Sequence, residues 1–144
     1  MPLLSSILLC PLLTLAAVLC APARAAGFIR WICALGALAA TVLSAQLWLT
    51  YDGVTGGFQF VEQHAWVEAV GISYHLGVDG FSTVLVMLTS IVFLTGVLTM
   101  WDLVNRVKEY FAFMVLLVVG VYGVFMALDL FFFFFFYEVA VVPM

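Results

Sequence analysis

A single carboxylate, Glu138, stands inside the most apolar stretch of the chain, residues 129–144, which reads DLFFFFFFYEVAVVPM. If a helix starts at Asp129, Glu138 follows nine residues later, and at about 1.5 Å per residue it lies roughly 13 Å into a hydrocarbon core about 30 Å thick. An acidic group there costs about 2.5–3.5 kcal/mol, so such groups are rare, face the protein interior and usually mark an ion or proton path. The first candidate for chemistry is therefore Glu138, as a proton relay.

The neighbours of Glu138 suit that role. They are aromatic and aliphatic, so they favour the neutral acid, whereas an approaching cation favours the carboxylate. A proton can then be taken up and released as a positive charge withdraws and returns. The alternative is a structural carboxylic acid hydrogen-bonded to a neighbouring helix. Pro143 disfavours helical geometry at Val142 and predicts a helix break beside Glu138, although prolines are also common in membrane helices without a mechanistic role.

Three further groups are weaker candidates. Glu109 directly precedes an apolar span and is placed to sit at the mouth of a half-channel, although it also belongs to a charged connection with Asp102, Arg106 and Lys108. Asp102 and Arg106 are spaced for a pair if that connection is helical. Asp79 is expected to cap the helix that follows it. His75 has the near-neutral titration of a proton carrier, and a solvated loop histidine is the simpler interpretation.

The elements that position these groups are membrane helices. The chain has 144 residues, of which 67% are hydrophobic and 8% charged, far from the soluble average of roughly a quarter charged. We expect an all-α, polytopic transmembrane helix bundle, truncated within its fifth helix, that forms part of one membrane domain. The expected spans are residues 2–21, 31–51, 78–101, 110–128 and an incomplete 130–144, with an outer loop at 52–77.

Charge sets the expected orientation. All four basic residues fall in two short connections, and the positive-inside rule places both on the cytoplasmic side and the N-terminus outside; they are Arg24, Arg30, Arg106 and Lys108. The scattered acidic residues give no nucleic-acid footprint, and the three cysteines lack metal-ligand spacing. Ala23-Arg24-Ala25 after an apolar run resembles a secretory cleavage site. A retained first helix is simpler, because no basic residue precedes that run and further spans follow it.

Two local patterns refine the helical expectation. The outer loop shows rough period-two alternation between glycine-rich turns, which fits either a short β-hairpin on the membrane surface or an irregular loop. In the fourth span, Gly120 and Gly123 provide a face that another helix can approach closely. Tyr122, between them, is expected to point elsewhere and to serve in packing.

Several segments together resemble a known family, the proton-pumping membrane subunit of NADH-quinone oxidoreductase (respiratory complex I), called M in bacteria and subunit 4 in mitochondria. The matching segments are residues 71–80 (GISYHLGVDG), 107–111 (VKEYF), 123–131 (GVFMALDLF), Phe136-Tyr137-Glu138 and Pro143-Met144. The family usually has Trp at the position of Tyr137. Residues 1–70 match only in hydropathy and span placement.

The resemblance implies that Glu138 is the family's fifth-helix glutamate, which pairs with a lysine later in the chain and changes its proton occupancy during pumping. It implies that the chain binds no cofactor itself, with NADH, FMN, iron-sulfur clusters and quinone held elsewhere in the complex. The implied partners are other complex I membrane subunits, the lipid bilayer and protons, and the implied location is the bacterial inner (cytoplasmic) membrane or the mitochondrial inner membrane.

Two other functions fit the sequence less well. One is a subunit of a related cation/proton antiporter or membrane-bound hydrogenase. The other, from a different class, is a small membrane scaffold or assembly protein, for which Glu138 would have no role in proton coupling.

Overall fold

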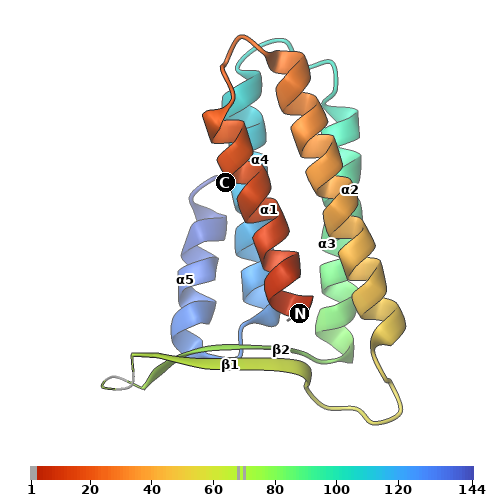
Figure 1. Ribbon diagram of the computed structural model, residues 1–144, viewed down its shortest axis with the longest axis vertical. Helices are drawn as coiled ribbons and strands as arrows, with labels where there is room; N and C mark the ends of the chain where they lie inside the picture. Colours follow the sequence, from red (N-terminus) through yellow and green to blue (C-terminus); the bar gives the residue numbers. More distant parts are fainter. Residues whose placement is uncertain (1–2, 68, 70) are drawn as a thin grey trace.

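The computed structural model describes residues 3–67, 69 and 71–144. They form a helical bundle closed at one end by a two-stranded hairpin (Figure 1). The order is α1 (Leu3–Cys20), α2 (Ala26–Thr50), β1 (Gln59–Val67), β2 (Ile72–Val78), α3 (Gly80–Thr99), α4 (Val107–Met126) and α5 (Leu130–Val141).

Four of these helices, α1 to α4, are long and apolar enough to cross a membrane, which fits the expected polytopic bundle. The first expected span began at Pro2, which lies outside the described residues. The second helix starts earlier than expected, so Arg30 lies inside its first turns and not in the connection. From there the Arg30 guanidinium donates to the Leu103 carbonyl at 2.7 Å and ties α2 to the α3–α4 connection.

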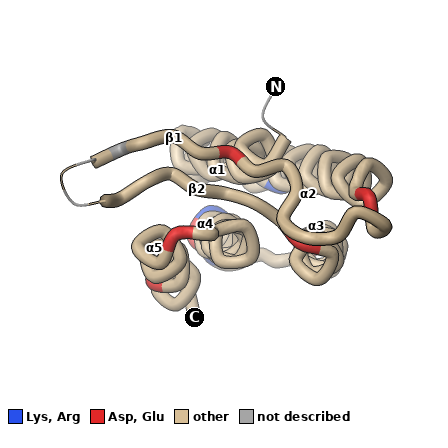
Figure 2. Tube along the Cα trace, turned by 90° about the horizontal axis from the view of Figure 1, so that it is seen from below, with Lys and Arg blue, Asp and Glu red and all other residues tan. Residues whose placement is uncertain are grey.

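The helix α4 occupies the middle of the bundle and packs against α1, α2, α3 and α5, whereas α5 packs mainly on α4 (Figures 1 and 2). The core is made of aliphatic and aromatic side chains from all four long helices; its largest fully buried members include Leu4, Ile7, Ile29, Leu47, Val86, Phe93, Phe111, Tyr122 and Met126. Because Leu4, Ile7 and Val18 are fully buried, α1 is an integral part of this core.

The outer loop forms the β-hairpin and not the irregular alternative. The strands β1 and β2 pair antiparallel, with Gln59 opposite Val78 and Gln63 opposite His75, and the register shifts in two places. The hairpin lies across the ends of the helices (Figures 1 and 2). The backbone N–H of Leu128 donates to the His75 carbonyl at 2.9 Å, so β2 is attached to the connection between α4 and α5.

The two ends of the bundle differ in charge. We call the end that carries the hairpin the hairpin end, and the end with the connections at residues 21–25 and 100–106 the turn end. All four basic residues of the chain lie at the turn end. The helical condition for a pair between Asp102 and Arg106 is not met, because the connection is not helical there: Arg106 has a φ of 53° and pairs with Glu109, at 3.6 Å.

Candidate functional site

The glycine face of α4 determines how α5 lies. A Cβ atom added to Gly120 would stand 2.5 Å from the backbone nitrogen of Ala140, and one added to Gly123 would overlap the ring of Phe136. Both glycines therefore allow a close approach that other residues would block, as the sequence predicted. Asp129 starts α5 by accepting a hydrogen bond from the Phe131 N–H at 2.8 Å. The α5 side chains buried against the bundle are Phe132 and Phe136.

This packing leaves Glu138 on the opposite side of α5. Phe136 faces α4, and a residue two positions further is turned by about 200° around the helix axis. Glu138 is accordingly exposed. Among the described residues, no hydrogen bond or ion pair engages its carboxylate. The structural alternative, a carboxylic acid bonded to a neighbouring helix, thus has no support within the part of the chain that the structure describes.

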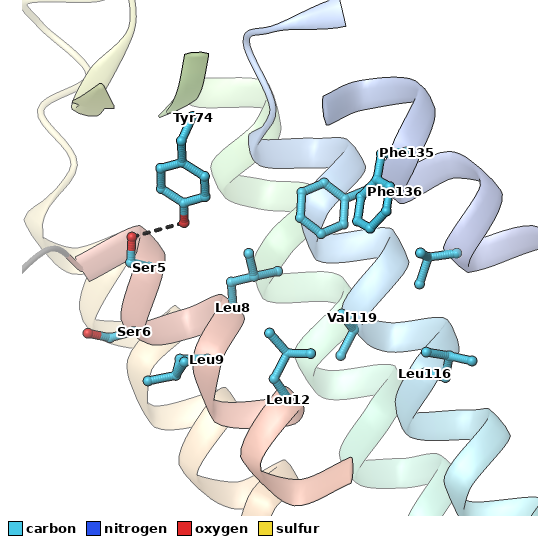
Figure 3. A pocket seen from close by; sticks show the side chains of 11 residues that line it. Ser5, Ser6, Leu8, Leu9, Leu12, Tyr74, Leu116, Val119, Phe135 and Phe136 are labelled. Atoms are coloured by element: carbon cyan, nitrogen blue, oxygen red, sulfur yellow. Dashed lines mark hydrogen bonds between the residues drawn. The ribbon is translucent and has the colours of Figure 1, made fainter. Parts of the chain in front are cut away.

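An apolar groove lies beside this face, between α1, α4 and α5. Its cavity of about 580 Å³ is lined on α5 by Phe135, Phe136 and Val139. Leucines of α1 and the side chains of Leu116 and Val119 on α4 form the other walls (Figure 3). The groove reaches the hairpin end at Ser5 and Tyr74, whose hydroxyl oxygens are 3.0 Å apart. Phe135 and Val139, which lie within three residues of Glu138 on α5, therefore line a space that the described helices leave open.

A second polar feature of the bundle interior was not predicted. The hydroxyl of Ser90 on α3 donates to the Val86 carbonyl at 2.9 Å and lies 2.6 Å from both the Ser44 hydroxyl of α2 and the Tyr122 hydroxyl of α4. All three residues are almost completely buried. We call them the hydroxyl triad. Tyr122 points away from α5, as expected, and the signal for its partners was small polar residues within apolar helices.

Glu62 on β1 also escaped sequence reasoning. Its carboxylate accepts from the backbone N–H of Leu4 at 2.9 Å, and from the backbone and the hydroxyl of Ser5. These amides at the start of α1 have no partner within their own helix. A strand residue 58 positions away in the sequence therefore caps α1. Burial raises the pKa of the nearby Tyr74, and the charge of Glu62 acts in the same direction, while its bond to Ser5 opposes them.

The weaker candidates occupy ordinary structural positions. Asp79 accepts from the Ser82 N–H at 2.7 Å and caps α3, as predicted, and these hydrogen bonds hold the pKa of its carboxyl below the usual value. Glu109 is 60% exposed in its ion pair with Arg106, as the charged-loop interpretation expects. His75 is partly buried within β2. The helix α5 ends at Val141, two residues before Pro143.

Among the described residues there is no group of three or more His, Cys, Asp or Glu side chains arranged to hold a metal ion. The three cysteines are free, and Cys33 is buried within α2. Among the described side chains, the groups that stand out are therefore one unengaged carboxylate on α5, a hydroxyl triad with its partners inside the bundle, and capping carboxylates at the hairpin end.

Comparison with known proteins finds that the chain is similar to subunits of quinone oxidoreductases. The chain is 31% identical over 144 residues to NAD(P)H-quinone oxidoreductase chain 4 1 of Nostoc sp., covering 99% of this chain and 27% of that protein. It is 37% identical to NADH-quinone oxidoreductase subunit M of Rhodobacter capsulatus (80% and 22% covered) and 39% identical to that of Pseudomonas aeruginosa (80% and 24%). No family model matches the chain.

These relatives confirm the predicted resemblance to subunit M, or chain 4, and extend it. Sequence inspection found specific matches only from residue 71 onward, whereas the similarity to the Nostoc protein runs over 99% of the chain. The chain spans about a quarter of the length of the curated relatives it matches.

Proposed function

We propose that this chain, similar over its length to subunit M and chain 4, is part of a membrane subunit of a proton-translocating NADH-quinone oxidoreductase. In that complex, electron transfer from NADH to a quinone drives proton pumping. This chain takes part as a translocase component and performs no redox chemistry. NADH, FMN, iron-sulfur clusters and quinone are bound by other subunits, and its own partners are neighbouring membrane subunits.

The observation that carries the proposal is the position of Glu138. It lies on the face of α5 turned away from α4, and no other described residue engages it. An acidic group at mid-membrane depth that faced lipid would cost about 2.5–3.5 kcal/mol, so this face requires a polar or protein neighbour. We infer that another segment of the complete subunit covers it and supplies a positive charge, which the resemblance identifies as a lysine.

A cation that approaches and withdraws gives Glu138 its function. A positive charge within about 4–6 Å of a carboxylate favours its ionised form, and withdrawal of that charge removes the effect. Each cycle then takes up one proton and releases it. Glu138 therefore acts as the relay, and movement of the partner charge sets its protonation.

The charge asymmetry supports one orientation. The turn end carries all four basic residues, and the positive-inside rule places such connections in the cytoplasm. The hairpin end and the N-terminus then face outward, across the bacterial inner membrane or the equivalent organellar membrane. Cysteine labelling at Gly27 of the turn end and Val54 of the hairpin end, with an impermeant reagent on intact cells, tests this assignment. Labelling of residue 27 but not 54 would reverse it.

The decisive experiment on function is Glu138→Gln in the complete subunit, within its assembled complex. The amide keeps the shape of the side chain but cannot exchange a proton. We expect proton-coupled quinone reductase activity to fall by about 100-fold, within the 10²–10⁴ that a positioned proton-transfer group contributes. The matched control is Tyr137→Phe, at an exposed neighbour on the same helix, and its activity should stay within about twofold of the original.

Assembly is measured alongside activity, by the amount of intact complex in the membrane. An assembled Glu138→Gln complex with full coupled activity would contradict the proposal and favour the scaffold alternative. To separate the oxidoreductase from a related antiporter, NADH-dependent quinone reduction is compared with sodium-dependent proton exchange in the same vesicles. The antiporter function would be assigned instead if the original protein shows no quinone reductase activity and Glu138→Gln loses the sodium-dependent proton exchange.

A further inference from the structure

Two neighbouring cavities at the turn end differ in polarity. The first, about 570 Å³, has walls of Leu15 and Leu19 from α1 and Ala112, Phe113 and Leu116 from α4. The second, about 300 Å³, lies between the α1–α2 connection and the start of α4 and is lined by Ala23, Ala26, Val104, Arg106 and Val107. Both are also lined by Lys108 and Glu109. The two cavities meet at these shared residues. We call the first, apolar cavity the slot and the second, charged cavity the mouth.

The mouth carries positive charge held in a fixed place. The Lys108 ammonium donates to the carbonyls of Leu19 and Ala21 at 2.8 and 2.9 Å, which caps the end of α1 and holds the nitrogen at the junction of slot and mouth. Arg106 is 83% exposed and is only partly neutralised by Glu109 at 3.6 Å. Arg24 is exposed in the same connection as Ala23. In the lining of the mouth, two cations, Arg106 and Lys108, thus face one carboxylate, Glu109.

The start of α4 adds donors to the same mouth. Its N-cap residue is Arg106, whose side chain makes no capping hydrogen bond. The first backbone N–H groups of a helix have no partner within it and attract anionic oxygens. A phosphate group in the mouth would meet these amides together with the guanidinium and the ammonium.

We propose that this slot and mouth form a binding site for an anionic phospholipid of the leaflet at the turn end. The phosphate lies in the mouth beside Arg106 and Lys108, and one acyl chain lies in the slot between α1 and α4. Basic pockets between membrane helices are known to bind such headgroups. The site is independent of Glu138, and its test does not depend on the proposed function.

A lipid fits these observations better than a docked protein helix. A protein helix needs an apolar face and no cavity for a charged group, whereas the slot ends in a mouth with a net positive charge. The cavity on the other side of α4 provides a contrast within the same molecule. It holds about 330 Å³ and is lined by apolar residues and Thr89, with no charged side chain among its described lining.

The test uses the complete protein purified in mild detergent and native mass spectrometry with added phosphatidylglycerol or phosphatidylcholine. We expect phosphatidylglycerol to bind more tightly, and Arg106→Ala to weaken it about fivefold, the effect of one basic residue near an anionic headgroup. Arg106→Lys should keep most of the affinity. Glu109→Gln should raise it, because the variant removes the carboxylate that competes with the phosphate for Arg106.

A second pair of variants tests the slot. Ala112→Trp fills it and should reduce phosphatidylglycerol binding at least tenfold. The matched control is Leu117→Trp, which places the same side chain on α4 in the uncharged cavity and should leave binding within twofold. Equal binding of the two lipids, or equal effects of the two tryptophans, would overturn the site. An affinity for phosphatidylglycerol that is unchanged in both Arg106→Ala and Glu109→Gln would overturn it as well.

Discussion

The hydroxyl triad and the outer face of α5 place polar groups in the same apolar bundle in opposite ways. The Ser90 hydroxyl lies 2.6 Å from the hydroxyls of both Ser44 and Tyr122, which joins three helices. The Glu138 carboxylate costs more free energy in an apolar environment than a hydroxyl does, yet no described residue engages it. A polar group with its partners in place holds helices together, whereas Glu138 is left open to the partner charge that we propose for it. Under that proposal, the difference separates a structural polar group from a mechanistic one within one bundle.

Variants of the hydroxyl triad and of Glu138 should differ most in coupled activity. Tyr122→Phe removes the hydroxyl of the largest side chain in the triad. We expect the rate of proton-coupled quinone reduction to stay within about twofold of the original, because Ser90 keeps its bonds to Ser44 and Val86. Glu138→Gln should lower the same rate about 100-fold. Both are measured on assembled complex in membrane vesicles. If Tyr122→Phe were as damaging as Glu138→Gln, the triad would belong to the proton path and the comparison would fail.

The rotation of α5 is the next target. Gly123→Ala places a methyl group into the ring of Phe136, and overpacking of this kind costs about 1–3 kcal/mol. We expect α5 to move off α4, with loss of stability in denaturant titrations and of coupled activity, because Glu138 turns with its helix. Gly27→Ala is the matched control, since a methyl group there meets nothing within 4 Å. Equal stability of both variants would show that the glycine face does not set the helix position.

The hydroxyl triad should contribute measurably to the free energy of unfolding. Ser90→Ala removes the hydroxyl shared by Ser44 and Tyr122, and we expect a loss of about 1 kcal/mol in the free energy of unfolding. Thr95→Ala is the control, because Thr95 is exposed and bonds only to carbonyls of its own helix. A stabilised Ser90→Ala variant would mean that the triad is tolerated and does not hold the helices.

The smallest effect concerns a carboxylate that is already engaged. Asp79→Ala removes the cap of α3 and should cost about 0.5–1 kcal/mol, measured by thermal unfolding. Because the folded-state pKa of Asp79 is lowered, its contribution is present above the pKa of a free aspartate and is lost as the pH falls below that value and through the lowered folded-state pKa. Asp79→Asn should retain most of the cap and remove this dependence on pH. A pH profile unchanged in Asp79→Asn would contradict the assignment.

Sequence reasoning predicted what depends on local pattern. Hydropathy predicted the membrane helices, and the Asp79 cap followed from its place before an apolar run. The spacing of Gly120 and Gly123 predicted a face for close helix approach, and the structure shows that α5 is the helix that packs there. Contacts between distant residues were beyond it. Nothing local links Glu62 to Leu4, or Ser44 to Ser90. The left-handed backbone at Arg106 also could not be foreseen, so the spacing of Asp102 and Arg106 left open whether they pair.

The Glu62 cap has a consequence for how the protein is made. The amides at the start of α1 emerge from the ribosome first, but the carboxylate that receives them is synthesised 58 positions later, after the whole of α2. Until β1 has crossed to the side where α1 begins, that end of α1 lacks its cap. The first helix therefore reaches its final state late in biogenesis. Glu62→Ala should prolong the period in which a protease acting at the hairpin end can cut the nascent chain near Ser5.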